Sequence, residues 1–572
     1  MFDRARSLRP RHRNGSVSGE LASDGWPRRF AAAPPNGAGS TGTGTATADD
    51  THAHTHAHTR PTLAIPTTAM SLVLALGTAA STAPIAAADD APTPAPLGTV
   101  TPVVESAPTE SIMIAYEGPG SWKAILDQVA AHVTTSGDAD IVVIVDSADE
   151  RDEALSFMSG AGAVMERVRP IILETDSIWI RDYGPRPALE SGIRVFADGV
   201  YNRPRPADDA FAAAWASTTG SIRYELPLIL GGGNLVAFPG GAARATNALL
   251  AENPDLTPGG INGLLNSLLG VVPLIGPTLP ESIDPTAHIN TWMMPIESAV
   301  VVSEWPENPG SPQAIVCENA AAQLAAEGRT VVRTPARFDG GVHYTYTNAL
   351  ICNDLVLIPA YGGGVPDTFN AEAAAAWGAV ASGRTVIPIE IDPLAAAGGG
   401  LHTVSLNLPA WTGGEAPRVR VQTPVPGTML TPGETIDITW ITDDDEGVVA
   451  LNIFASVDGG QTFNYLIDVG TPDDGHTTWT VPPVFSLDAR IRVTARDADG
   501  NASSDLTDGP LQIGMPPLEG DINGDGQVNF TDLVTMLGVW GPCPACPFCP
   551  ADLDGDCLVG FSDLVRLLTN LS

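Results

Sequence analysis

Basic residues and cysteines are scarce in this sequence of 572 residues. Lys and Arg total 29 against 66 Asp and Glu, so the formal net charge is -37. A protein that binds nucleic acid or an anionic membrane surface brings Lys and Arg to phosphates, so this balance argues against both classes. Only 6 Cys occur, and four of them lie within the last thirty residues. The main body therefore does not depend on a disulfide framework.

The sequence also lacks an apolar run long enough to span a membrane. The strongest run, from Met70 to Ala80, is followed by small residues and predicts a signal peptide over 70–88. We therefore expect a secreted or cell-surface protein. Residues 1–69 form a leader that we expect to be disordered, and either the leader is unusually long or translation starts near Met70. The alternating His of 52–58 are interpreted as low-complexity filler rather than a metal site.

Alternating strand and helix patterns begin after a Pro-rich linker over 89–107. A strand is predicted at Ser111–Tyr116, an amphipathic helix at Ser121–Thr134 and a buried strand at Ile141–Val145. The alternation continues over 108–409 and predicts an α/β domain. A doubly wound sheet fits this pattern.

Four polar clusters stand out in the α/β region: Trp179-Ile180-Arg181-Asp182-Tyr183-Gly184-Pro185, His288-Ile289-Asn290, Tyr346-Thr347-Asn348 and Gly398-Gly399-Gly400-Leu401-His402-Thr403. In this order they resemble the bacterial peptidyl-arginine deiminase and agmatine deiminase family. Members of that family hydrolyse a guanidinium to a ureido group and ammonia. The resemblance implies a five-bladed α/β propeller (pentein) with the active site along its axis and without a cofactor.

The chemistry of deimination accounts for the residue types in these clusters. A guanidinium is a cationic, poor electrophile, so carboxylates must hold its nitrogens while a thiolate attacks the carbon and a His moves protons. Asp182 matches the first family carboxylate, and His288 matches the general acid and base. Trp179 is expected to form an apolar wall for the arginine methylenes, and Asn348 matches a residue that organises the site. The excess of acidic residues suits a cationic ligand, although it equally serves solubility.

Two positions depart from the family pattern. Thr403 stands where the family has its nucleophilic Cys, and Asn290 stands where it has a second Asp. A Thr hydroxyl does not ionise near neutral pH, whereas a thiol does so readily. Two functions therefore remain open: a protein-arginine deiminase, or a catalytically impaired relative that binds arginine peptides or serves as a cell-surface component. Cys352 is a conceivable relocated nucleophile, but its strand-like surroundings favour a structural thiol.

Two arginines bear on substrate choice. The resemblance matches Arg203 and Arg205 to a pair that captures the α-carboxylate of a C-terminal arginine, for which a guanidinium fork is well suited. Agmatine has no carboxylate, so the pair favours peptidyl arginine over agmatine. Gly231-Gly232-Gly233-Asn234 is similar to the family's Gly-Gly-Asn turn, but the apolar residues 235–238 that follow it depart from the expected polar pattern.

Short alternating strands replace the helices over 417–515. Strand patterns punctuated by Asp-Gly turns are typical of a small β-sandwich, similar to immunoglobulin-like or fibronectin-like modules. Trp440 and Trp479 are predicted core residues. A spacer or adhesion module is favoured over a sugar-binding one, because no polar cluster accompanies these aromatic residues.

An internal duplication over 519–572 carries oxygen ligands at the spacing of calcium loops. The predicted ligands are Asp521, Asn523, Asp525, Asn529 and Asp532 in the first loop, and Asp552, Asp554, Asp556 and Asp563 in the second. The pair resembles a dockerin domain, which implies a cohesin-like or cell-surface partner. Cys557 replaces the turn Gly expected in the second loop. Together with Cys543, Cys546 and Cys549 it forms either a zinc site or two disulfides, and export favours disulfides.

Overall fold

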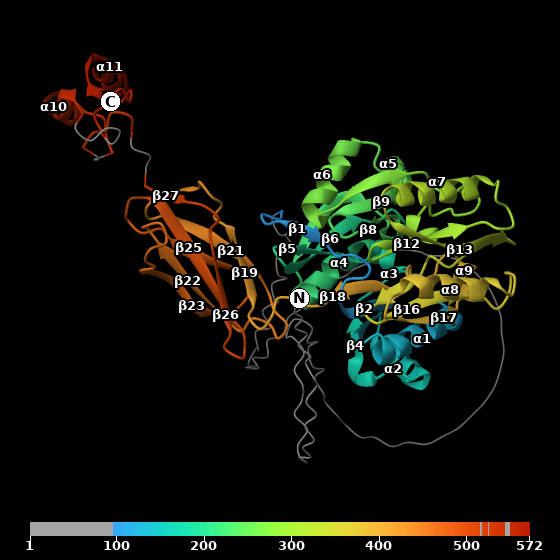
Figure 1. The fold of residues 1–572 in the computed structure, drawn as a ribbon. Helices are drawn as coiled ribbons and strands as arrows, with labels where there is room; N and C mark the ends of the chain where they lie inside the picture. Colours follow the sequence, from blue (N-terminus) through green and yellow to red (C-terminus); the bar gives the residue numbers. More distant parts are fainter. Residues whose placement is uncertain (1–94, 515–517, 524–525, 544–548, 572) are drawn as a thin grey trace, which may run out of the picture. The chain divides into compact units, whose positions relative to one another are not determined.

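The computed structural model describes residues 95–514, 518–523, 526–543 and 549–571. The predicted leader and signal peptide lie outside these residues. Between residues 100 and 409 the chain forms five small sheets with helices packed on them (Figure 1). The mixed α/β class is therefore confirmed. The strands do not join into one continuous sheet, so the doubly wound alternative is wrong.

The five sheets repeat one pattern. In spatial order they are β1 (Val100–Pro102), β5 (Arg186–Glu190), β6 (Ile193–Val200) and β7 (Arg223–Ile229); β10 (Val272–Gly276), β9 (Ala242–Thr246) and β8 (Val236–Ala237); β11 (Met293–Ile296), β12 (Ala299–Glu304), β13 (Thr330–Asp339) and β14 (Val342–Thr345); β15 (Leu350–Cys352), β16 (Leu355–Ala360) and β17 (Thr385–Glu390); and β18 (Leu406–Pro409), β2 (Thr109–Ala115), β3 (Asp140–Val145) and β4 (Val168–Ile172). Each contains an antiparallel pair joined to a parallel pair. In the last sheet β18 lies beside β2, with Leu406 opposite Met113, so the two ends of the region meet.

A helix connects the two strands of a parallel pair in every sheet, as a parallel crossover requires. The helices of this region are α1 (Gly120–Ser136), α2 (Ala148–Ala161), α3 (Ile180–Tyr183), α4 (Pro206–Thr219), α5 (Ala248–Glu252), α6 (Pro258–Leu269), α7 (Pro312–Ala326), α8 (Phe369–Val380) and α9 (Asp392–Ala395). Helix α6 shows the local signals: Thr257 Oγ1 accepts from Gly260 N at 3.1 Å, Pro258 occupies the first turn, and Gly270 ends the helix with a φ of 67°. No helix among the described residues is long and apolar enough to cross a membrane.

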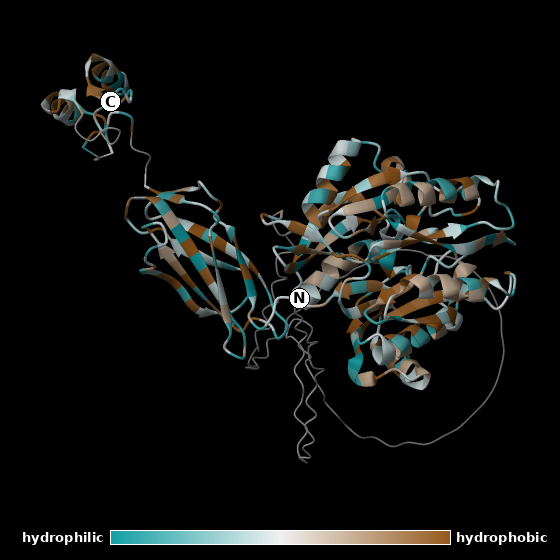
Figure 2. Ribbon diagram, in the orientation of Figure 1, coloured by the Kyte–Doolittle hydropathy of each residue, from teal (hydrophilic) through white to brown (hydrophobic). Residues whose placement is uncertain are grey.

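Apolar strands contribute many of the buried core residues of this region. The residues of β3 from Ile141 to Val145 are all buried, because helices or neighbouring sheets cover both faces of a parallel strand. Figure 2 shows hydrophobic residues concentrated along these strands. The predicted strand and helix at 111–134 are confirmed as β2 and α1.

The linker predicted over 89–107 is wrong in its second half. Residues 100–102 form β1, which pairs antiparallel with β5, and the side chain of Glu105 is only 13% exposed. The Pro-rich composition hid this order, because a three-residue edge strand carries almost no periodic signal.

Residues 418–513 form two further sheets. The first contains β19 (Arg418–Thr423), β21 (Thr435–Asp443) and β24 (His476–Thr480); the second contains β20 (Met429–Leu430), β27 (Leu511–Ile513), β25 (Ser486–Arg496), β22 (Ala450–Ser456), β23 (Tyr465–Thr471) and β26 (Ala502–Leu506). Buried and partly buried residues alternate along most of β25, and alternating colours run along these strands in Figure 2. Trp440 and Trp479 are buried in one cluster with residues of both sheets, as predicted.

The C-terminal segment holds two short helices, α10 (Phe530–Gly538) and α11 (Phe561–Asn570), and the strand pair β28 (Gly541–Pro542) and β29 (Leu558–Val559). Each helix begins with the carboxylate of an Asp turned back onto the cap backbone, Asp532 in α10 and Asp563 in α11. Cys543 and Cys549 form a disulfide, and Cys557 is also disulfide-bonded. The preference for disulfides over zinc is therefore confirmed at these three cysteines, while Cys546 lies outside the described residues.

Candidate active site

A cavity of about 260 Å³ gathers the predicted site residues from segments far apart in the sequence. Its lining includes seven of the eight residues predicted to act on substrate: Trp179, Asp182, Arg203, Arg205, His288, Asn290 and Thr403. The eighth, Asn348, lies directly behind Thr403 and lines a neighbouring cavity of about 200 Å³. The four polar clusters of the sequence therefore meet in one place.

The glycine-rich segment before Thr403 is required by close packing. Gly398 has a φ of 87°, which favours glycine. A Cβ at Gly399 would lie 2.1 Å from the Trp179 ring, and one at Gly400 would lie 2.8 Å from the Asn348 amide. These glycines let the chain pass between Trp179 and Asn348, and so bring Thr403 to the cavity.

Asp182 and His288 lie next to each other in the cavity lining. Asp182, on α3, has its Oδ1 3.5 Å from His288 Nδ1, and the same oxygen accepts from Gly233 N at 3.1 Å. A Cβ on Gly231 or on Gly233 would lie 2.6 Å from the His288 ring. The glycine turn is therefore needed to admit the imidazole, while the apolar residues after it, such as Phe238, are buried in the core.

The position of the family nucleophile is occupied by a hydrogen-bonded hydroxyl. Asn348 Oδ1 accepts from the backbone N–H of His402 at 2.9 Å and of Thr403 at 3.1 Å. Asn348 Nδ2 lies 2.9 Å from Thr403 Oγ1, to which it donates. An amide cannot act as a base, so this partner fixes the hydroxyl without activating it.

The two thiols in the main body lie away from this cavity. Cys352 is fully buried in β15 with Sγ 3.7 Å from Gly137 O, and Cys317 is fully buried in α7. Burial raises the pKa of each thiol to about 12. A relocated nucleophile at Cys352 is therefore wrong, because the thiol neither reaches the cavity nor ionises near neutral pH.

A buried charge network lies behind the site and was missed by the sequence analysis. Glu105 Oε2 is 3.0 Å from His402 Nε2, and its Oε1 is 3.5 Å from Arg181 Nη1. Burial alone would raise the pKa of Glu105, but the charge of Arg181 and the interaction with His402 lower it to about 2. The only signal in the sequence was a lone acidic residue inside an apolar, Pro-rich stretch.

Arg203 and Arg205 occupy the cavity rim in different ways. Arg205 Nη1 donates to Tyr201 Oη at 3.1 Å and to Ser177 Oγ at 3.2 Å, which holds one guanidinium edge in place. Arg203 is exposed to solvent. Both line the same cavity, so one fixed and one accessible cation flank its entrance.

The two C-terminal loops share one hydrogen-bond pattern. Asp532 Oδ1 accepts from Ile522 N and Asn523 N, and Asp563 Oδ1 accepts in the same way from Leu553 N and Asp554 N, at 2.7 to 3.1 Å. These parallel contacts support the internal duplication.

The turn of each loop is equivalent as well. Gly526 N donates to Asp521 Oδ2, and Cys557 N donates to Asp552 Oδ2. Cys557 has a φ of 70°, so it adopts the left-handed conformation that Gly526 adopts in the first loop. The second loop therefore keeps its shape without the expected glycine.

The acidic side chains of the second loop converge. Carboxylate oxygens of Asp552, Asp554 and Asp563 all lie within 4.8 Å of one another. Asp556 donates its backbone N–H to Asp552 and Asp554, and Asn529 caps α10 in the first loop. Oxygen donors of this kind suit a hard cation such as Ca²⁺. Asp525 lies outside the described residues.

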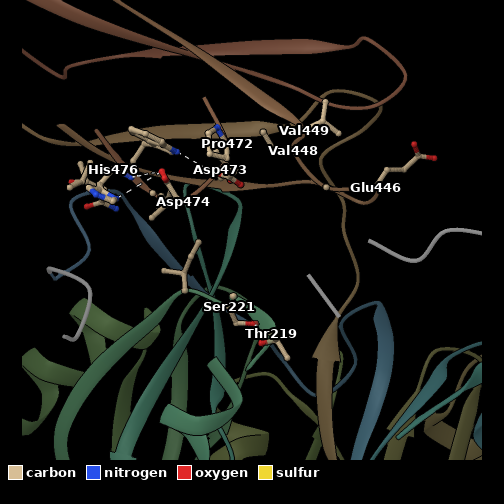
Figure 3. A pocket seen from close by; sticks show the side chains of 18 of the residues that line it. Thr219, Ser221, Glu446, Val448, Val449, Pro472, Asp473, Asp474 and His476 are labelled. Atoms are coloured by element: carbon tan, nitrogen blue, oxygen red, sulfur yellow. Dashed lines mark hydrogen bonds and ion pairs between the residues drawn. The ribbon is translucent and has the colours of Figure 1, made fainter. Parts of the chain in front are cut away.

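A larger cavity of about 800 Å³ has Asp473, Asp474 and His476 among its lining residues (Figure 3). Residues 218–222 line it together with residues of β21 and of the turn before β24. Asp474 Oδ1 and His476 Nδ1 are 3.9 Å apart, and their side chains are 48% and 65% exposed. These groups do not form a catalytic constellation, so the smaller cavity at Thr403 remains the candidate site.

Known proteins similar to this chain include agmatine deiminases. A relative from Photobacterium profundum, assigned as an agmatine deiminase, is 24% identical over 204 residues, which cover 32% of this chain and 54% of the relative. The agmatine deiminase of Stutzerimonas stutzeri is 22% identical over 292 residues, 43% of this chain and 77% of the relative. The chain thus spans about half to three quarters of these relatives.

A solved agmatine deiminase of Enterococcus faecalis aligns with 55% of this chain and 97% of its own, at 18% identity and a TM-score of 0.48. The family described as Porphyromonas-type peptidyl-arginine deiminase matches residues 103–409, which is more than half of the chain. The chain belongs to the Porphyromonas-type peptidyl-arginine deiminase family.

Proposed function

We propose that residues 103–409 bind the arginine side chain of a peptide, with a free C-terminal arginine preferred, and that they form citrulline poorly or not at all. One observation carries this proposal: the nucleophile position holds Thr403, whose hydroxyl is hydrogen-bonded to the Asn348 amide. Loss of the nucleophile from a hydrolase costs on the order of 10⁶ in rate, about 8 kcal/mol of transition-state stabilisation.

The groups that recognise a guanidinium are retained around that position. Asp182 offers a carboxylate and Asn290 offers an amide, while Trp179 lines the cavity as an apolar wall. Arg203 and Arg205 at the rim supply cations for a substrate carboxylate, which suits a C-terminal arginine better than agmatine. Exchanging the family carboxylate for Asn290 weakens guanidinium binding by roughly 1–2 kcal/mol but does not abolish it.

The second candidate function is an active protein-arginine deiminase. The 3.5 Å approach of His288 to Asp182 favours it, because this pair is suited to proton transfer at a bound guanidinium. An active enzyme needs a nucleophile other than the two buried thiols of the main body.

We further propose that residues 108–409 form a five-bladed α/β propeller, with no cofactor. The five sheets of repeated antiparallel and parallel pairing support this architecture. For 417–515 we propose an immunoglobulin-like or fibronectin-like β-sandwich, supported by two sheets that share one core cluster. A secreted or cell-surface location remains part of the proposal, and disulfides in the C-terminal segment support it.

For residues 519–572 we propose a dockerin-like module that binds calcium in both loops and docks to a cohesin-like or cell-surface partner. The carboxylates of the two loops would hold the ions, which would fix each loop against its helix. Apolar side chains at equivalent positions of α10 and α11 are exposed: Phe530, Val534 and Leu537 on the first helix, and Phe561, Val565 and Leu568 on the second. Two such stripes support a docking surface.

The decisive experiment measures binding and turnover on the same protein. Calorimetry with a peptide ending in arginine, its C-terminal amide and its citrulline counterpart should rank the free acid first. A citrulline assay on the same samples should detect no product. Equal affinity for the three peptides would reject the pocket, and robust citrulline formation would favour the active deiminase.

A further inference from the structure

Glu105 contacts His402, and His402 in turn contacts Asn290, which lines the cavity. We propose that Glu105 is a positioning residue: it holds His402 as the neutral tautomer protonated at Nε2, so that Asn290 turns its Oδ1 toward the cavity as an acceptor for a guanidinium N–H. The last step of this inference rests on the proposed function, whereas the tautomer does not.

The first step is set by the carboxylate. Glu105 Oε2 lies 3.0 Å from His402 Nε2, although the direction of the contact does not meet the geometry of a hydrogen bond. A carboxylate oxygen this close repels a lone pair and favours a proton on that nitrogen. His402 is 1% exposed, which leaves no solvent to compete with this contact. Arg181 neutralises the second oxygen of Glu105 at 3.5 Å and donates from Nε to the His402 carbonyl at 3.2 Å. The network fixes both the ring and its backbone.

The second step follows from the other ring nitrogen. His402 Nδ1 lies 2.9 Å from Asn290 Nδ2. In a neutral ring protonated at Nε2, Nδ1 is an acceptor, so the Asn290 amide must donate its N–H there. Three charged side chains act on the ring, Glu105, Arg181 and Asp182, and burial together with Arg181 lowers the pKa of His402 despite the two carboxylates.

The third step concerns the oxygen that remains. Among the described residues Asn290 Oδ1 is buried and has no hydrogen-bond partner, while Asn290 itself lines the cavity. A Cβ on Gly233 would lie 2.9 Å from this oxygen, so the glycine turn leaves just enough room for it. A buried acceptor without a partner is costly, and a guanidinium N–H would satisfy it.

The same geometry explains why an amide matches this position. A carboxylate at position 290 would favour a proton on His402 Nδ1 as well as on Nε2. The ring would then be an imidazolium between two carboxylates. Protonated His402 would reverse the Asn290 amide and present N–H groups to a cationic ligand. The orientation of the Asn290 amide therefore depends on Glu105, because both residues contact the His402 ring.

The test uses the full chain with ¹⁵N-labelled His rings, and the His402 signal is identified by its loss in His402→Gln. In the ligand-free wild type at neutral pH we expect a protonated Nε2 and an unprotonated Nδ1. Glu105→Gln retains an acceptor and should keep this signature, whereas Glu105→Leu should lose it. Glu110→Gln, which removes a carboxylate paired with Arg194 instead, is the matched control and should change nothing.

Peptide binding provides the second readout. Glu105→Leu should weaken affinity for an arginine peptide about tenfold through loss of one oriented hydrogen bond, and Glu105→Gln should restore most of it. A wild-type ring that is doubly protonated, or protonated at Nδ1, would overturn the inference even if Glu105→Leu does not fold. Failure of the wild type to bind any arginine peptide would instead refute the proposed function, with the ring signature still deciding the role of Glu105.

Discussion

Changing Asn290 to Asp and Thr403 to Cys together is expected to create citrulline-forming activity in a chain that has little or none. The Cys side chain would replace the Thr403 hydroxyl beside the Asn348 amide. It would supply a thiol whose pKa is lowered by the bound guanidinium cation. The new Asp would restore a carboxylate that pairs with the guanidinium. His288 and Asp182, 3.5 Å apart, would remain as the proton-transfer pair.

The structure sets how much activity returns. An Asp at 290 faces His402 Nδ1 at 2.9 Å, where burial and Arg181 oppose the proton that it needs. A misplacement of about 1 Å costs about 100-fold in rate. A total nucleophile effect on the order of 10⁶, reduced by that 100-fold misplacement, leaves about 10⁴ as the most that the double variant is expected to recover over Thr403→Val. Thr403→Cys alone should recover less, and Asn290→Asp alone should recover none.

The assay is citrulline formation from a peptide ending in arginine, followed for the wild type, both single variants, the double variant and Thr403→Val. Cys352→Ala in each background is the control for the buried thiol, and it should leave every rate unchanged. Robust wild-type turnover that survives Thr403→Val would refute the reasoning, because it would show that the nucleophile is elsewhere. A double variant no faster than Asn290→Asp would refute the assignment of position 403.

Three further predictions concern the rim, the tail and acid stability. Arg203→Ala should weaken binding of a C-terminal arginine peptide but not of its amide, and calorimetry that finds equal losses would contradict carboxylate capture. Calcium titration of the full chain should find two sites, and Asp532→Ala and Asp563→Ala should each remove one; an unchanged stoichiometry would reject that loop. Because the pKa of Glu105 is lowered from 4.5 to about 2, its stabilisation is present above pH 4.5 and is lost as the pH falls toward 2. The free energy of unfolding should fall by about 3 kcal/mol over that window, and Glu105→Gln should flatten the fall; parallel curves would refute the coupling.

Chemistry that depends on residue type was accessible from the sequence. The polar clusters around Asp182, His288 and Thr403 carried a family resemblance that implied one site, and the structure brings them to one cavity. Strands such as β3 and helices such as α1 followed from apolar periodicity, because a periodic apolar face must be buried somewhere. The strand-like surroundings of Cys352 likewise predicted a buried thiol.

Pairings between distant segments were not accessible in this way. A doubly wound sheet and five separate sheets produce the same alternation of strands and helices, since periodicity describes faces and not partners. The ordering of 100–105 depends on the edge of β5 and on Arg181 and His402, which lie far along the chain.

The amino-acid sequence by itself determined which groups this protein can use: a carboxylate, an imidazole and rim arginines, with Thr403 in place of a thiol. Only the tertiary structure decided which hydrogen-bond and charged partners those groups have. Asn348 is hydrogen-bonded to the Thr403 hydroxyl, and His402 lies between Glu105 and Asn290, in contact with both. The physical reason is that protonation and amide orientation depend on neighbours within about 3 Å, and packing selects those neighbours from residues hundreds of positions apart.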